Sequence, residues 1–438
     1  MSTDSHRPLG LADLILFNVA AVLGVQWIAA SAHIGPFALP LHAAAALLFF
    51  LPCARVVAAL ARRFPDDDGF PAWVTRAFGD WHGFLCAWSY WISVLVYLPG
   101  LLMAGAGMAA YAVGPRLADD ARFVIPLTLA VLWSIVGVNI AGLRISKWLN
   151  DAGGLLIYAA GLVVVTASVC VWWQSGSATA LQLTATRDWE SVSLWAQIAF
   201  AYTGLELGSV LGREVRAPKR TIPRAAWISA TAVFAAYVFG TVSLMVVLPP
   251  ERIHPMTGIV GVAAAAGERT GAEWLGGTVA ALLFAGIAGR FSTWAGGVSR
   301  VPIGIGTPNK TLFVEAVACS AFVLITQQGE TLRAGWQTLT DLAILTTFLP
   351  FVYIFVCGWR YGARVSSASG LLVTVAAILL SVVPPASVAS VWLFELKVIG
   401  GCALLAALGR IAYNRVASRP HSRPVSESSH SDARQYLP

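Results

Sequence analysis

The sequence is poor in charged residues. Only 12% of its 438 residues are Asp, Glu, Lys or Arg, and 57% are hydrophobic, whereas a soluble globular protein carries about 25% charged residues. Residues 14–54 contain none of the four charged types, and this stretch is long enough for two membrane helices of about 20 residues each. The composition therefore excludes a soluble domain and predicts an all-α polytopic membrane protein.

Paired cysteines are also missing. The six cysteines stand singly in apolar segments and none forms a Cys-x-x-Cys pair, so we expect buried, inert thiols and no disulfide framework. They are Cys53, Cys86, Cys170, Cys319, Cys357 and Cys402. No motif indicates a metal or a cofactor. Residues 1–13 are polar and lead into a full-length span without the pattern of a cleavable signal.

The uncharged segments predict twelve helical spans. Two fit within residues 14–54, with the turn between them at Gly35-Pro36 and Pro40. The third lies within 81–115, and the others are expected at 123–143, 149–173, 192–212, 225–248, 274–298, 311–327, 338–358, 366–384 and 390–410.

The basic residues predict the orientation of these spans. The two tails and the even-numbered connections hold 20 Lys and Arg, whereas the odd-numbered connections hold 6. This bias places both termini in the cytoplasm, since basic loops stay on that side of the cytoplasmic membrane. The net charge of +7 is then a matter of topology and indicates no nucleic-acid partner; the bilayer is the partner expected.

The most informative stretch is Phe200-Ala201-Tyr202-Thr203-Gly204-Leu205-Glu206, in expected span 6. A carboxylate at bilayer depth costs about 2.5–3.5 kcal/mol on insertion scales, and such residues usually face a cavity or a partner. Glycine weakens the helix and lets backbone groups face a ligand. Together they predict a broken helix that lines a solute site.

Span 1 has a corresponding glycine, Gly24, in Val22-Leu23-Gly24-Val25-Gln26-Trp27. Spans 1 and 6 enter the membrane from opposite sides if five spans precede the sixth. Interrupted helices at matching positions of two inverted halves are typical of secondary transporters. We therefore predict breaks near Gly24 and Gly204.

Beyond Glu206 the chain continues with Glu214-Val215, Pro218, Arg220 and Ile222-Pro223-Arg224-Ala225. This pattern resembles the amino acid–polyamine–organocation permeases, whose sixth span ends in F-A-F-x-G-[FW]-E followed by E-E-V-x-N-P-x-R-x-I-P-R-A. Residues 61–91 are similar to the same family's stretch between spans 2 and 3. Shorter matches are Val138-Asn139, Gly142, Trp294, Gly297 and Arg300.

The resemblance implies a leucine-transporter-type fold and alternating access to a small amino acid or amine near the midplane. It divides the chain into a cytoplasmic tail (1–13), spans 1–5 as a first repeat (14–175), spans 6–10 as an inverted second repeat (190–360), spans 11–12 (365–414) and a disordered tail (415–438). A homodimer is left open. An accessory subunit or solute sensor that does not transport is the alternative on the same fold.

The resemblance also implies the solute-binding residues. Backbone N–H groups at the span 1 break would hold a carboxylate, and carbonyls at the span 6 break an amino group. These positions are Gly24, Val25 and Gln26 in span 1, Phe200, Ala201, Tyr202, Thr203 and Gly204 in span 6, and Trp294 in span 8. Phe200 matches an aromatic residue that covers the substrate in some relatives.

The sequence departs from the family pattern at the first break. The family's G-[ST]-G-[IV]-F is replaced by Gly24-Val25-Gln26-Trp27-Ile28, so a side-chain amide stands where a second glycine is usual. Span 5 lacks the lysine that replaces a sodium ion in some relatives. The connection Val301 to Asn309 between spans 8 and 9 is shorter than in the family.

Two charged residues are expected to serve coupling or gating. Glu206 has the alternative of capping the broken helix or pairing with a loop arginine. Arg290 lies four residues before Trp294 and shares its helix face. Its guanidinium is expected between spans 1 and 8, where related folds hold a cation; the alternatives are snorkelling or a pair with Glu315.

Other function classes lack support in the sequence. An intramembrane enzyme needs clustered nucleophile motifs within its spans, and a channel needs repeated pore motifs; neither is found. The run Asp66-Asp67-Asp68 is read as solvated or capping loop acids and not as a metal site. A non-enzymatic secondary transporter remains the interpretation.

Overall fold

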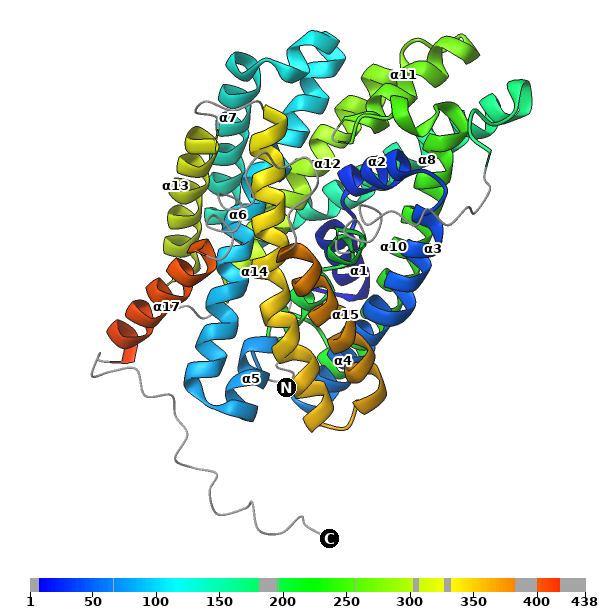
Figure 1. The fold of residues 1–438 in the computed structure, drawn as a ribbon. Coiled ribbons are helices and arrows are strands. Elements are labelled where there is room, and N and C mark those ends of the chain that lie inside the picture. Colours follow the sequence, from blue (N-terminus) through cyan, green and yellow to red (C-terminus); the bar gives the residue numbers. More distant parts are fainter. Residues whose placement is uncertain are drawn as a thin grey trace.

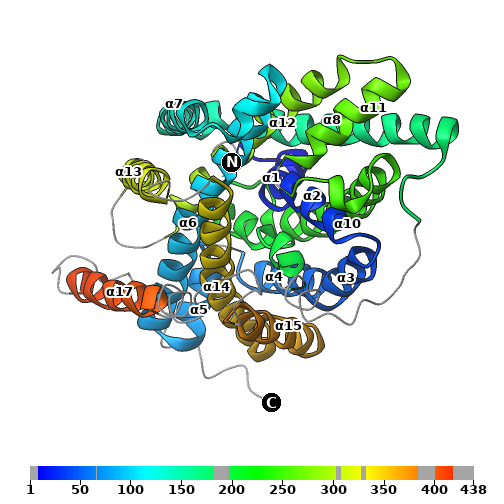
Figure 2. The same ribbon diagram turned by 45° about the horizontal axis from the view of Figure 1, so that its top comes forward.

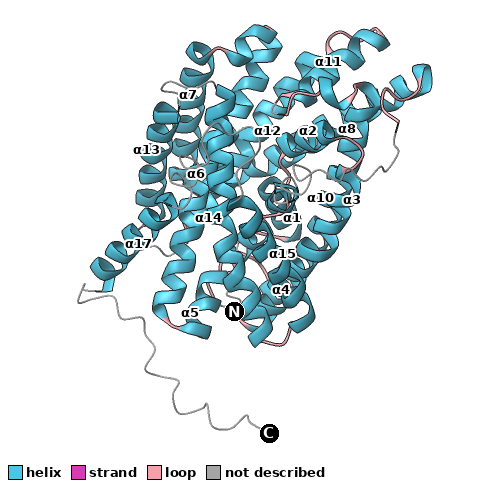
Figure 3. Ribbon diagram, viewed as in Figure 1, coloured by secondary structure: helices cyan, strands magenta, loops and turns pink. Residues whose placement is uncertain are grey.

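The computed structural model describes residues 8–65, 67–180, 195, 197–255, 257–301, 307–326, 332–382 and 400–417. Within these ranges the fold is all-helical, as expected, and no β-strand forms (Figure 3). Within the same ranges, Leu9 and Val215 form an isolated parallel β-bridge.

The helices follow one another through short connections and pack into one bundle (Figure 1). In chain order they are α1 (Leu11–Val22), α2 (Val25–Ile34), α3 (Ala38–Ala45), the π-helical η2 (Ala46–Phe50), α4 (Leu51–Arg63), α5 (Phe70–Phe78), α6 (Asp80–Val113), η3 (Pro115–Asp119), α7 (Ala121–Ile140), α8 (Leu143–Ser175), the 3-10 helix η4 (Leu205–Leu211), α10 (Pro218–Val247), η5 (Pro250–Arg252), α11 (Gly258–Thr270), α12 (Leu275–Val298), α13 (Pro308–Thr326), α14 (Leu332–Arg360), α15 (Arg364–Val382) and α17 (Gly401–Ala417).

Seven described helices are long and apolar enough to cross a membrane, and the bent pair of α1 and α2 raises the number to eight. These findings fit a polytopic membrane protein, whereas the count of twelve and the inverted repeat stay predictions. Residues 390–399 of expected span 12 lie outside the described residues. So do the tail beyond residue 417 and residues 302–306 of the short connection.

The first predicted break is confirmed. Helix α1 ends at Val22, Leu23 and Gly24 are extended, and α2 begins at Val25. The axes of the two halves differ by 45°. Helix α1 lies inside the bundle, against α8, α10, α12 and η4 (Figure 2).

The second predicted break is confirmed as well. Residues 197–201 are helical, 202–204 are not, and η4 then begins at Leu205. Gly204 has φ of +116°, in the region that only glycine adopts without strain. The conformation at the span 6 break therefore requires a glycine, the residue type from which the break was predicted.

Helices α8 and α12 approach each other through glycines. A Cβ atom on Gly153 of α8 would lie 2.6 Å from the Cα of Gly289 on α12. Gly286 is equally crowded, because its Cβ would lie 2.7 Å from Ile157 Cγ1. The two backbones therefore touch without a layer of side chains between them.

Two α-helices of the described part were not anticipated, and both lie in connections between spans. Helix α5 starts after Gly69, at φ of +73°, with Pro71 in its first turn, a position where the missing N–H of proline costs nothing. Helix α11 is alanine-rich and is capped at its C-terminal end by Gly271, at φ of +74°.

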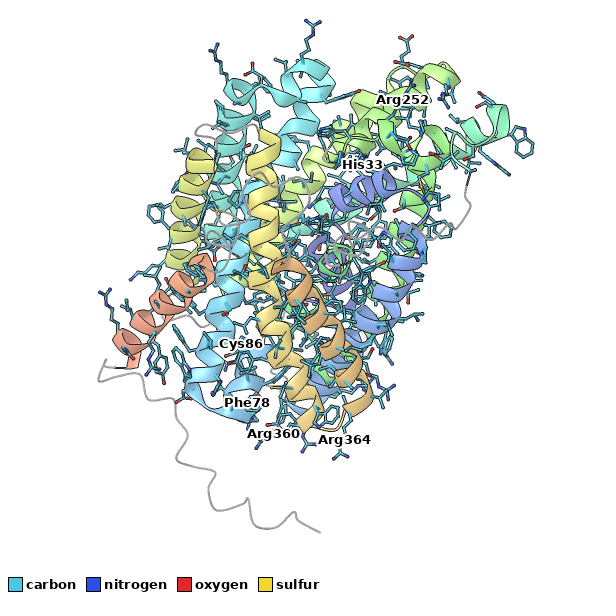
Figure 4. The ribbon with its side chains drawn as sticks, viewed as in Figure 1. His33, Phe78, Cys86, Arg252, Arg360 and Arg364 are labelled. Carbon is cyan, nitrogen blue, oxygen red and sulfur yellow. The ribbon has the colours of Figure 1, made fainter. Side chains whose placement is uncertain are left out.

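The two ends of the bundle carry different groups (Figure 4). His33 and Arg252 are at one end, whereas Phe78, Arg360 and Arg364 are at the opposite end. The positive-inside pattern assigns Arg252 to the outside and the pair Arg360 and Arg364 to the cytoplasm. Their separation agrees with this alternation, while the orientation itself stays a prediction.

The outward face of the bundle is apolar. Large exposed side chains on it include Leu162, Val169, Trp172 and Trp173 of α8. Cys170 lies among them and is exposed, so the expectation that every thiol is buried is wrong. The reason is that this face of α8 is directed away from the other helices.

Candidate functional site

The hydroxyl of Tyr237, on α10, connects the two helix breaks. It accepts a hydrogen bond from the backbone N–H of Gly24 at 3.0 Å. It also lies 3.0 Å from the carbonyl oxygen of Val22 and 2.9 Å from that of Ala201. A phenol has one proton, so it donates to one of these two carbonyls at a time. One side chain thereby satisfies backbone groups of spans 1 and 6 together.

Two side chains of α12 cover the next carbonyls of span 1. The indole Nε1 of Trp294 donates to the Ala21 oxygen at 2.8 Å. Nη1 of Arg290 donates to the Ala20 oxygen at 3.3 Å. The prediction that these two residues share a helix face is therefore confirmed, and Arg290 lies between α1 and α12 as expected.

Arg290 belongs to a buried polar cluster with Tyr97 of α6 and Gln26 of α2. Its Nη2 donates to the Tyr97 hydroxyl at 3.0 Å, and Gln26 Nε2 donates to the same hydroxyl at 3.0 Å. The exposed fractions of Arg290 and Gln26 are 3% and 1%. Among the described residues, Arg290 Nε and Gln26 Oε1 have no hydrogen-bond partner.

Aromatic rings surround this cluster. The Phe200 ring packs edge-on against Trp27 and Tyr97, with centroid distances of 5.5 and 5.7 Å. Trp294 packs against Tyr97 at 5.8 Å. Phe200 is buried, with an exposed fraction of 5%, so it is not a lipid-facing ring.

Glu206 holds the span 6 break in place. Both of its carboxylate oxygens accept from the Gly204 N–H at 3.0 Å, and Oε1 accepts from the Tyr90 hydroxyl at 2.6 Å. Glu206 is fully buried. These contacts are those of the capping alternative, since no loop arginine pairs with it among the described ion pairs.

The remaining predicted site residues also lie at the breaks. Val25 is the first residue of α2 and is buried. Thr203 folds back on the end of the preceding helix, where its Oγ1 donates to the Phe200 carbonyl at 2.8 Å. Gly204 lies against span 1, because a Cβ there would be 3.0 Å from the Ala21 oxygen. The solute-binding residues predicted in span 1 and those predicted in span 6 therefore lie next to each other.

A buried histidine was missed by the sequence analysis. His42 of α3 is fully buried, with Nε2 at 2.9 Å from Ser31 Oγ and Nδ1 at 3.1 Å from the Tyr202 hydroxyl. Its ring stacks on Tyr237 at 5.4 Å. It thus links spans 1, 2, 6 and 7. Its only signal was a polar ring in an uncharged stretch.

The alternative pairing of Arg290 with Glu315 is wrong. Glu315, on α13, instead accepts a hydrogen bond from the indole of Trp91 at 2.9 Å. The neighbouring α6 residue Tyr90 binds Glu206, so α6 separates Glu315 from the cluster on α12.

The loop acids make ion pairs. Asp67 accepts two hydrogen bonds from Arg76, at 2.8 and 3.2 Å, and Asp68 pairs with Arg213 at 2.6 Å. Burial raises the pKa of the Asp68 carboxyl despite the opposing charge of Arg213. Asp66 lies outside the described residues. Asp67 thus links its loop to α5, and Asp68 links the same loop to the segment after η4.

Comparison with known proteins bears on this site. Residues 9–307 match a family described as amino acid permease, and this range includes both breaks. An uncharacterized transporter of Legionella pneumophila is 24% identical over 442 residues, which covers 91% of this chain and 95% of the relative.

Two similar proteins of Lactococcus lactis have named solutes. The glutamate/gamma-aminobutyrate antiporter is 21% identical, over 90% of this chain and 87% of its own length. A probable agmatine/putrescine antiporter is 23% identical over 58% of this chain, and the match covers 54% of that relative.

Proposed function

Because this chain belongs to the amino acid permease family, within the amino acid–polyamine–organocation group, we propose that it moves an amino acid or a related amine across the cytoplasmic membrane by alternating access. The family and its relatives make it a multi-pass membrane transporter. The supporting observation is the meeting of two broken helices at the Tyr237 hydroxyl.

In this proposal the solute binds where the breaks adjoin. Gly24, Val25 and Gln26 form one side, Trp294 covers the end of α1, and the other side comes from residues 200–204. Phe200 closes the site through its contacts with Trp27 and Tyr97. The relatives suggest glutamate and γ-aminobutyrate, or agmatine and putrescine, as first solutes to test.

Arg290 is proposed to replace a bound sodium ion. Its guanidinium contacts the Ala20 carbonyl of span 1 from α12, and arginine keeps its proton in proteins. A permanent charge there removes the need for a cation from solution. We therefore expect exchange or facilitated movement that is independent of sodium.

The test is solute flux in proteoliposomes with and without a sodium gradient, for the wild type and Arg290→Ser. We expect wild-type flux to be the same with and without the sodium gradient, and flux through Arg290→Ser to depend on it. Sodium-driven accumulation by the wild type contradicts the coupling proposal.

A sensor or accessory subunit that does not transport is the second candidate. Tyr237 and Trp294 already engage backbone groups at the breaks, which a bound solute would have to displace. Binding of a solute without any flux in the same proteoliposomes would favour this candidate.

A further inference from the structure

At the first break, one of the backbone donors expected to bind a solute is engaged by a side chain. The Gly24 N–H donates to Tyr237, and the Trp27 N–H donates to the Gly24 carbonyl at 2.9 Å. Helix N-termini attract carboxylates through free N–H groups. Here the Gly24 N–H is already bound to Tyr237, so a carboxylate has one backbone donor fewer at this helix end.

Side-chain groups without a hydrogen-bond partner lie in the neighbouring cluster of Arg290, Tyr97 and Gln26. Arg290 Nε has no partner within the described residues, and neither has Gln26 Oε1. The Tyr97 hydroxyl accepts from both neighbours, and no described group accepts its own proton. Buried polar groups are normally satisfied, so exceptions such as these call for an explanation.

The charge of Arg290 is also uncompensated. None of the ion pairs within the described ranges includes it. The two buried glutamates among the described residues have other partners: Glu206 binds Gly204 and Tyr90, and Glu315 binds Trp91. A buried guanidinium without a counter-ion is costly, whereas a carboxylate offers it a charge-assisted, two-pronged contact.

We propose that Arg290, together with Tyr97 and Gln26, forms a subsite that binds the carboxylate of the solute. The carboxylate contacts Arg290 Nε and the Tyr97 hydroxyl proton, and the rings of Phe200 and Trp294 beside Tyr97 line the path of the carbon chain. This inference rests on the proposed transport function and narrows its substrate class. Solutes that carry a carboxylate are accepted, and diamines are rejected by the positive charge.

Two four-carbon solutes test the charge directly. γ-Aminobutyrate and putrescine are similar in length, but one ends in a carboxylate and the other in a second ammonium. The full-length protein is purified, and binding is followed by thermal shift and by flux in proteoliposomes. We expect the wild type to prefer γ-aminobutyrate by at least about tenfold, as a charge-assisted hydrogen bond implies. Glutamate and alanine extend the panel for a different chain length.

Three variants separate the contribution of the Arg290 charge from that of the guanidinium geometry and the Tyr97 hydroxyl. Arg290→Gln is expected to lower affinity for carboxylates about 10- to 100-fold and to relax the rejection of putrescine. Arg290→Lys keeps the positive charge but loses the planar guanidinium, which can contact a carboxylate through two N–H groups. It should retain part of the preference for carboxylates. Tyr97→Phe, which leaves the charge intact, should weaken carboxylate binding about threefold to tenfold.

Arg300→Gln is the matched control. Arg300 follows α12 and pairs with Glu214 at 3.2 Å, so its loss removes an arginine from the same part of the chain without touching the cluster. The preference should stay as in the wild type. If Arg290→Gln does not fold, Tyr97→Phe and Arg290→Lys still test the subsite.

The outcomes distinguish this inference from the proposed function. Flux of putrescine but not of carboxylates would overturn the inference and leave transport standing. Carboxylate binding that depends on Arg290, without flux, would support the subsite and overturn transport. An unchanged preference in both Arg290→Gln and Tyr97→Phe overturns the subsite, and so does the absence of binding with every member of the panel.

Discussion

The two helix breaks satisfy their backbone groups from different sources. At the span 6 break the partner is local, since Glu206 accepts from the N–H of Gly204 only two residues away. At the span 1 break the partners are distant in sequence. Tyr237 of α10 and the side chains of α12 reach the groups that α1 leaves open.

This difference indicates how each break behaves. A break that is capped mainly by its own chain depends less on the position of its neighbours. A break that is held by three other side chains keeps its shape only while α10 and α12 stay in place. We therefore expect the span 1 break to respond more strongly to movement of its neighbours than the span 6 break does.

The largest expected effect comes from Glu206→Ala. The change leaves the buried N–H of Gly204 and the buried hydroxyl of Tyr90 without an acceptor, at about 1–3 kcal/mol for each. The apparent unfolding temperature of the detergent-solubilised protein should fall strongly. Glu206→Gln, which keeps one accepting oxygen, should lose less. Equal stability of Glu206→Ala and wild type would refute the local cap.

The next largest loss of stability is expected for Gly204→Ala, which we compare with Gly24→Ala. A side chain at φ of +116° costs about 1–3 kcal/mol in backbone strain alone. Gly24 has φ of −99°, which alanine adopts freely, although its Cβ would displace the Trp27 ring. We expect Gly204→Ala to have the lower unfolding temperature. The reverse order would mean that side-chain crowding at span 1 outweighs backbone strain at span 6.

Tyr237→Phe should have a smaller effect on stability, of about 1–2 kcal/mol, but it should affect both breaks. The lost hydroxyl serves Gly24, Val22 and Ala201. Hydrogen–deuterium exchange should therefore rise at the span 1 break more than at the capped span 6 break.

Tyr158→Phe provides the matched control for this change. The buried hydroxyl of Tyr158, on α8, has no hydrogen-bond partner among the described residues. Its removal should leave the exchange at both breaks unchanged. Equal exchange in Tyr237→Phe and Tyr158→Phe would show that the Tyr237 hydroxyl does not hold the breaks together.

The breaks could be predicted because glycine within an apolar run is a local signal. Gly204 has the positive φ that makes glycine necessary, and Gly24 is the N-cap of α2. The shared face of Arg290 and Trp294 was equally accessible, since a spacing of four residues places both on one side of a helix.

The partners of these residues could not be predicted. Tyr237 is 213 residues from Gly24 in the chain, and nothing in the apolar sequence of α10 distinguishes this tyrosine from one that packs in the core. Tyr90 as a partner of Glu206 and the partners of Arg290 were missed for the same reason, whereas the capping role of Glu206 was among the predicted alternatives. A hydroxyl or a carbonyl from another helix leaves no charge pattern, whereas the ion pairs considered for Glu206 and Arg290 relied on charge.

The glycine contact between α8 and α12 has a mechanical consequence. A layer of side chains can rearrange by changing rotamers, but backbones that touch at Gly153 and Gly289 cannot slide past each other without a collision. The seam between α12 and α1 is instead bridged by hydrogen bonds from Arg290 and Trp294, which can break and form again. We therefore expect α8 and α12 to move as one stiff body, with the hinge at the seam along α1.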